Sequence, residues 1–279
     1  MKNIVWLINP LTFTENEFEF PTYICEQMNG LLKVLFLEND SLEYIPFISN
    51  DPVFPTIEYG MDTKQINDKN QKLIEENKAL FFDLVKQKKL SLTVHNESGT
   101  LMQQVIEESR FADMMLVKSS MSLSYEDDRN PTSFVKQVLA KAECPVLIMP
   151  EDSQTINEIY FTYNGSHSSV FAIKHFSYLF PAFKYLPVTV LYVSEEKNDQ
   201  EDKQINDIRE LLYAQYKHVT VKVLQGTAEA ELFSELALKK NVIVTFGAFG
   251  RSTISRFFRK SSTNSILQTI DIPAFITHP

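Results

Sequence analysis

An internal repeat constrains the fold of this 279-residue chain more than any other feature of its sequence. Residues 119–135 align without a gap with residues 247–263, which lie 128 positions further along (from 119 to 247). The matches that extend this repeat are 114–117 with 242–245, 144–148 with 272–276, 92–94 with 219–221, and 8–10 with 163–165. Agreement over so many segments does not arise readily by chance. The sequence therefore predicts two copies of one folding unit.

The boundary between the copies is predicted at the short polar link Glu151-Asp152-Ser153-Gln154, which follows Pro150. This gives two domains, 1–152 and 153–279, and the total length suits two domains at ~100–200 residues each.

Each copy alternates short β-rich runs with helical patterns, which is typical of a parallel α/β sheet. We expect two tandem, open, parallel five-stranded sheets flanked by helices. The expected strands are 3–8, 32–37, 91–95, 113–117 and 146–149, then 157–163, 187–193, 218–223, 241–245 and 273–277. The expected helices are 65–88, 100–110 and 132–143, then 167–180, 200–217, 228–239 and 261–270. Residues 11–28 are expected to be helical only in their later part, and the proline-containing segment 40–62 is expected to be a long loop.

Glycines indicate where a ligand could bind. The second copy has Gly165, Gly226, Gly247 and Gly250, each predicted to follow the end of a strand. Open α/β sheets bind ligands at that edge, and glycines let the backbone approach a phosphate that lies at a helix N-terminus. An ordinary tight turn is the alternative explanation for each glycine.

The first copy lacks these glycines. Ser119 and Ser122 stand where Gly247 and Gly250 stand, and residues 124–128 add three carboxylates that would repel a phosphate chain. Thr132-Ser133 retains a possible anion-binding helix start. The first copy is therefore expected to be a degenerate nucleotide motif.

These segments resemble the universal stress protein family, whose ATP-binding members carry Gly-x2-Gly-x9-Gly-Ser/Thr in the last βα loop. Here Gly247-x2-Gly250 is followed by residues 251–259 and then by Lys260-Ser261, so lysine replaces the third glycine. The resemblance covers nearly the whole chain as a tandem pair. It implies the adenine-nucleotide α-hydrolase-like, or Rossmann-like, fold for both domains.

The resemblance also implies a binding site for ATP or a related adenine nucleotide, with or without Mg²⁺, in the second domain. Asn164 takes the place of a family aspartate near the adenosine, and the Val193 backbone corresponds to the adenine contact. Phe246 and Gly247 would border the ribose, and Gly250 would let the backbone approach the phosphates. The remaining positions implied are Gly165, Ser166, Phe249, Lys260, Ser261, Ser262 and Thr263. An ammonium at Lys260 could pair with a phosphate.

Composition argues against several other functions. A formal charge of −9 disfavours nucleic-acid binding, and the sequence has no apolar run of membrane-spanning length. Cys25 and Cys144 are far apart, which fits a cytoplasmic protein. Five scattered histidines suggest no metal site, and no catalytic residues can be identified.

The leading hypothesis is a cytosolic stress-response sensor or regulator that binds an adenine nucleotide. The alternatives are a scaffold of the same fold that binds no nucleotide, and a slow ATP-hydrolysing enzyme. The family's last strand often pairs across a twofold axis, so 146–149 and 273–277 would join the copies into a pseudo-dimer within one chain, and a homodimer could double it again.

Overall fold

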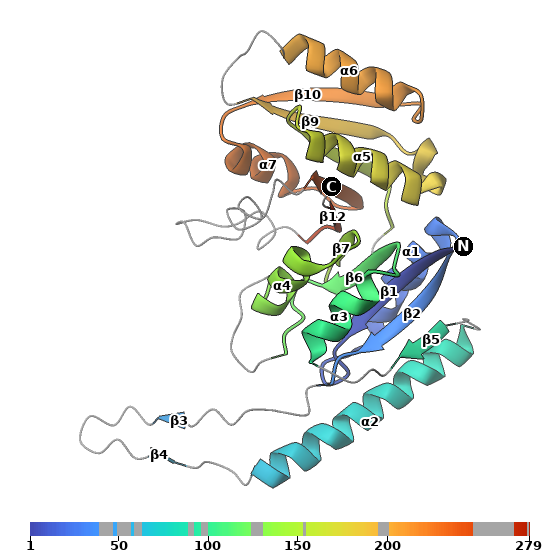
Figure 1. Cartoon of the computed structure of the whole chain (residues 1–279), viewed down its shortest axis with the longest axis vertical. Coiled ribbons are helices and arrows are strands. Elements are labelled where there is room, and N and C mark those ends of the chain that lie inside the picture. Colours follow the sequence, from blue (N-terminus) through green and yellow to red (C-terminus); the bar gives the residue numbers. More distant parts are fainter. Residues whose placement is uncertain are drawn as a thin grey trace.

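The computed structural model describes residues 1–38, 47–48, 57–58, 63–88, 92–95, 100–123, 131–152, 155–194, 201–247, 271–277 and 279. Within these residues the chain forms a ten-stranded sheet with helices on both faces (Figure 1). This arrangement confirms the predicted α/β class.

The strands of the large sheet are short and mostly buried, as the apolar runs predict. They are β1 (Lys2–Ile8), β2 (Gly30–Phe36), β5 (Leu92–His95), β6 (Met114–Lys118), β7 (Val146–Met149), β8 (Glu158–Tyr163), β9 (Val188–Ser194), β10 (Val219–Gln225), β11 (Val242–Gly247) and β12 (Ala274–Thr277). All ten fall on predicted strands. A separate pair, β3 (Phe47–Ile48) and β4 (Ile57–Glu58), lies in the segment expected to be a loop.

The strand order is β10-β9-β8-β11-β12-β7-β6-β1-β2-β5. We call β5-β2-β1-β6-β7 the first half of the sheet and β10-β9-β8-β11-β12 the second half. Every pair within a half is parallel, and the halves meet through the antiparallel pair β7–β12, with Phe275 opposite Leu147. The predicted pairing of 146–149 with 273–277 is therefore confirmed. The two expected sheets are one continuous sheet, and Figure 1 shows β7 and β12 at its centre, where the halves meet.

The helices connect these strands. They are α1 (Glu19–Met28), α2 (Thr63–Gln87), α3 (Leu101–Ser109), α4 (Ser133–Lys141), α5 (His167–Leu179), α6 (Glu201–Tyr213) and α7 (Ala228–Leu236), with short 3-10 helices η1 (Glu15–Phe18) and η2 (Pro181–Tyr185). Helix α6 ends four residues before the predicted end, because the chain turns there and buries Tyr216 before β10 begins. The helix predicted at 261–270 lies outside the described residues.

Two apolar layers hold the helices to the sheet. Alternate side chains of each strand point to opposite faces, so Trp6 and Val5, which are neighbours in β1, belong to different layers. One layer contains buried residues of α1, α2, α5 and α6, and the other contains those of α3, α4 and α7. In the first half, α1 follows β1 and α4 follows the adjacent strand β6, and these helices lie in different layers, which opens a crevice at the carboxyl ends of the two strands.

Candidate functional site

In the second half the central strands are β8 and β11, which are hydrogen-bonded neighbours. The loop after β8 contains three of the predicted site residues. The side-chain oxygen of Asn164 accepts the backbone N–H of Ser166 at 3.2 Å, and Gly165 has a φ of +77°. Ser166 caps α5 by accepting the N–H of Ser169 at 3.3 Å. These contacts fix a tight turn that leads directly into a helix N-terminus.

Gly247 ends β11 and packs directly against the first turn of α5. A Cβ added to Gly247 would lie 2.4 Å from the carbonyl oxygen of Ser168 and 2.6 Å from the backbone nitrogen of Ser169. Backbone cannot yield to such a contact at low cost. The glycine is therefore required for packing, whatever it does for a phosphate.

Val193 and Phe246 lie where the sequence places them. Val193 is next to last in β9 and pairs with Leu224 of β10, and Phe246 is buried in β11. The other predicted site residues lie outside the described residues: Phe249, Gly250, Lys260, Ser261, Ser262 and Thr263. Their grouping with Gly247 stays a prediction.

A polar cluster that the sequence did not indicate covers Gly165. The side-chain amide of Gln204, in the first turn of α6, lies 2.5–2.6 Å from where a Cβ on Gly165 would be. The hydroxyl of Tyr192 donates to the Gln204 side-chain oxygen at 2.8 Å, and that of Tyr163 donates to the Gln204 carbonyl at 3.3 Å. The sequence predicted the helix but gave no signal for the side chain that reaches across to the glycine.

The first half repeats the same turn after β1. The side-chain oxygen of Asn9 accepts the N–H of Leu11 at 3.0 Å, as Asn164 does two residues before Ser166. The amide nitrogen of Asn9 also donates to the carbonyl of Ser122 at 2.8 Å, which ties the turn to the loop after β6. Because β1 and β6 are hydrogen-bonded neighbours, this is the crevice of the first half.

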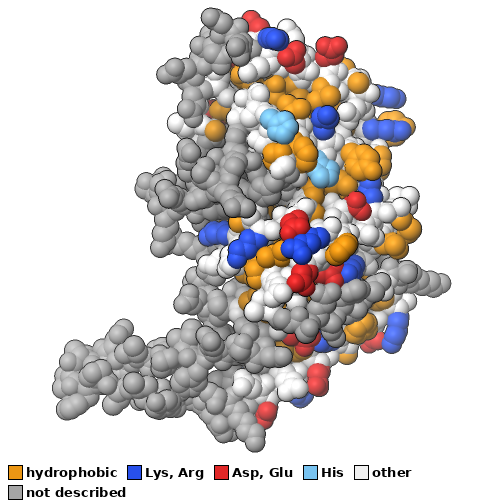
Figure 2. All heavy atoms as spheres, in the orientation of Figure 1, with side chains coloured by type: hydrophobic (Ala, Val, Ile, Leu, Met, Phe, Trp, Pro, Cys, Tyr) orange, Lys and Arg blue, Asp and Glu red, His pale blue; other side chains and the backbone are white. Residues whose placement is uncertain are grey.

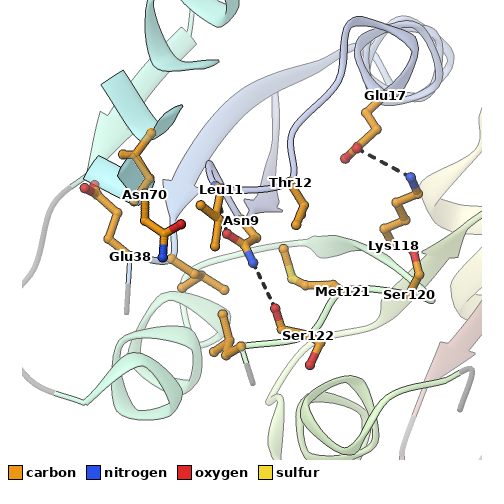
Figure 3. A pocket seen from close by; sticks show the side chains of 13 residues that line it. Asn9, Leu11, Thr12, Glu17, Glu38, Asn70, Lys118, Ser120, Met121 and Ser122 are labelled. Carbon is orange, nitrogen blue, oxygen red and sulfur yellow. Dashed lines mark hydrogen bonds and ion pairs between the residues drawn. The ribbon is translucent and has the colours of Figure 1, made fainter. Parts of the chain in front are cut away.

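A cavity of about 360 Å³ lies in that crevice (Figure 3). It is bounded by the turn after β1, the end of β2, one side of α2 and the loop after β6. Its lining residues are Asn9, Leu11, Thr12, Glu17, Leu37, Glu38, Asn70, Ile74, Lys118, Ser120, Met121, Ser122 and Leu123. The sequence predicted a degenerate nucleotide motif here and did not identify the residues that line this cavity. Its apolar lining comes from loops and from α2, which share no sequence motif.

Lys118, at the end of β6, is paired with two carboxylates. Its ammonium lies 3.4 Å from Glu17 and 3.0 Å from Glu151. Burial would lower the pKa of Lys118, but the hydrogen bond to Glu151 and the two negative charges more than offset it, so that pKa is raised. Burial raises the pKa of Glu17, against the opposing charge of Lys118. The positive charge of Lys118 at the end of β6 is thus balanced by neighbouring carboxylates.

The start of α4 in the first half is occupied by the chain itself. Thr132 is buried and caps α4 by accepting the N–H of Val135 at 3.2 Å, while its hydroxyl donates to the carbonyl of Met121. Its own N–H donates to the carbonyl of Ser119 at 3.3 Å. The loop after β6 therefore closes on this helix start with carbonyl groups, whereas an anion needs N–H donors.

One face of the molecule carries charges of both signs among the described residues (Figure 2). Figure 2 shows acidic and basic side chains interspersed on one face, without a continuous basic patch among the described residues. In the described part of the chain, no three His, Cys, Asp or Glu residues are grouped to hold a metal ion. No helix there is long and apolar enough to cross a membrane.

No protein-family profile and no curated protein matches the chain. Several solved structures match the chain. A universal stress protein from Archaeoglobus fulgidus has 15% identity and a TM-score of 0.70, covering 99% of this chain and 96% of its own. A putative universal stress protein from Pseudomonas aeruginosa has 13% identity and a TM-score of 0.59, covering 100% and 94%. A protein of unknown function from Pseudomonas aeruginosa has 12% identity and a TM-score of 0.60, covering 100% and 93%. The chain therefore has the fold of the universal stress proteins.

Proposed function

We propose that this protein is a cytosolic stress-response sensor or regulator that binds ATP or a related adenine nucleotide in its second half. The observation that carries the proposal is that the turn after β8 and the end of β11 lie together at one sheet edge. Asn164, Gly165 and Ser166 follow β8, and Gly247 ends the neighbouring strand at the same sheet edge. That edge is where open α/β sheets bind nucleotides.

Residues at this sheet edge offer groups that suit different parts of a nucleotide. Asn164 and the hydroxyl of Ser166 offer neutral polar groups, and the Val193 backbone lies one residue before the end of the strand that flanks β8. The sequence motif that continues from Gly247 to Ser261 supplies the proposed phosphate contacts. Mg²⁺, if bound, would neutralise phosphate charge.

Thermal and chemical unfolding with and without ATP and Mg²⁺ tests the proposal. A nucleotide at ~100 times its dissociation constant adds about 2.7 kcal/mol to the free energy of unfolding. We expect Gly250→Val to abolish this gain and Thr220→Val, at an exposed position of β10, to keep it. No shift at millimolar ATP, or an equal shift in both variants, would contradict the proposal.

An interaction scaffold that binds no nucleotide is the second candidate. It is favoured by Gln204, whose amide lies over Gly165 where a nucleotide would approach the turn. Absence of an ATP shift in the wild-type protein and in Gln204→Ala would favour the scaffold. Phosphate release above that of Gly250→Val would instead indicate a slow ATPase.

A further inference from the structure

The cavity of the first half has the size of a small-molecule site. Its volume of about 360 Å³ lies within the range of ~300–1,000 Å³ for such pockets. Five of its lining residues are apolar: Leu11, Leu37, Ile74, Met121 and Leu123. Hydroxyl and amide groups stand among them, including those of Thr12, Asn70 and Ser120, as Figure 3 shows.

The charges at this cavity disfavour an anion. Among the described residues of its lining, Lys118 is the one cation, and it is held by Glu17 and Glu151. Glu38, also in the lining, pairs with Lys78 of α2. An anionic group entering here would compete with carboxylates for cations that are already paired, and desolvating an unpaired charge is costly.

The start of α4 supports the same conclusion. The hydroxyl and N–H of Thr132 are both used within the chain, and the neighbouring loop presents the carbonyls of Ser119 and Met121 towards it. The hydroxyl and N–H of Thr132 are thus not available to a phosphate at this sheet edge.

We propose that the first half binds an uncharged, largely apolar small molecule of two or three rings in the cavity between the turn after β1, α2 and residues 119–123 after β6. The proposal concerns a different half and a different class of ligand from the nucleotide, so it does not rest on the proposed function. Apolar rings would pack on Leu37, Ile74 and Met121.

Two fluorescent probes with the same ring system test the charge selection. N-phenyl-1-naphthylamine is uncharged, and 8-anilino-1-naphthalenesulfonate carries a sulfonate. We expect the uncharged probe to bind the wild-type protein at least about tenfold more tightly. The chain has a single tryptophan, Trp6, whose ring lies 6.1 Å from that of Phe13 and 5.8 Å from that of Phe18, beside the segment that lines the cavity. Energy transfer from Trp6 should therefore locate the bound probe in the first half.

A pair of variants on α2 provides the local test. Ile74 lines the cavity, whereas its neighbour Leu73 is exposed and lies outside the lining. We expect Ile74→Lys to weaken the uncharged probe about tenfold and to strengthen the sulfonate probe, because it places an ammonium in the apolar wall. Leu73→Lys should change neither.

Three results would overturn the proposal: no binding of the uncharged probe, equal binding of both probes by the wild-type protein, or equal effects of Ile74→Lys and Leu73→Lys. The comparison of probes on the wild-type protein needs no variant, so it stands even if a substitution impairs folding. Circular dichroism of each variant checks that point.

Discussion

At the scale of single residues, the two asparagines at repeat-related positions show how the copies were kept alike. Asn9 and Asn164 each accept the N–H of the residue two positions later. The asparagine that replaces a family aspartate therefore has a local structural role in both halves. That role does not depend on a nucleotide, so the residue type at this position is a weak sign of ligand binding.

Buried Cys144 gives a prediction about alkaline stability. Burial raises the pKa of its thiol from 9.0 to about 12. Because the pKa is higher in the folded state, the protonated thiol contributes its full stabilisation below the pKa of the unfolded chain. This contribution is lost as the pH rises towards the folded-state pKa. The free energy of unfolding should then fall by about 1.4 kcal/mol per pH unit between about pH 9 and 12 through this residue.

Denaturant unfolding at several pH values, compared with Cys144→Ala, measures this slope. The variant should lose stability less steeply above pH 9. Tyr216, whose pKa burial also raises to about 12, adds a similar decline in both proteins above about pH 10. An identical slope in the variant between pH 9 and 10 would rule out the role assigned to Cys144.

At the scale of elements, two helix starts with the same cap residue differ in their surroundings. Thr132 caps α4 in a buried setting and also bonds the loop after β6, whereas Thr100 caps α3 at an exposed position through a 3.4 Å contact. Thr132 thus stabilises the loop after β6 as well as the start of α4.

We expect Thr132→Ala to cost about 2 kcal/mol of unfolding free energy and Thr100→Ala about 0.5 kcal/mol. Thr132→Ser, which keeps the hydroxyl, should recover most of the loss. Denaturant titrations of the three variants measure this, and equal losses at the two caps would show that the bond to Met121 contributes nothing.

The elements also show how far the sequence could predict the structure. Apolar periodicity located every strand of the large sheet and the α-helices of the described residues, and the resemblance to universal stress proteins implied that 146–149 would meet 273–277. The sequence did not predict that the side chain of Gln204 would lie over Gly165, or that a cavity would lie beside Lys118. Those features depend on which face of α6 and α2 turns towards the sheet edge, and tertiary packing decides that.

At the scale of the whole molecule, the continuous sheet couples the two halves. Phe275 of β12 is fully buried and packs on Phe176 of α5 and on Phe180, which follows that helix, with ring centroids 5.4 Å and 6.2 Å away. Its backbone pairs with Leu147 of the first half. A destabilising substitution in β12 should therefore lower the stability of both halves.

Phe275→Ala should cost about 3–5 kcal/mol, and the exposed Phe111→Ala should change stability by less than about 0.5 kcal/mol. Because Trp6 reports on the first half, its fluorescence transition should move together with the circular dichroism of the whole chain. A Trp6 transition that does not move in Phe275→Ala would mean that the halves unfold independently.

The antiparallel contact of β7 with β12 has a further consequence for how the halves can diverge. In an assembly of two identical chains, every substitution appears on both sides of the symmetry axis. Here the two sides are encoded separately, so one crevice can change its charge or its lining while the other is held constant. The paired central strands are also unavailable to a second chain, so an assembly that extends the sheet would use its outer strands β10 and β5.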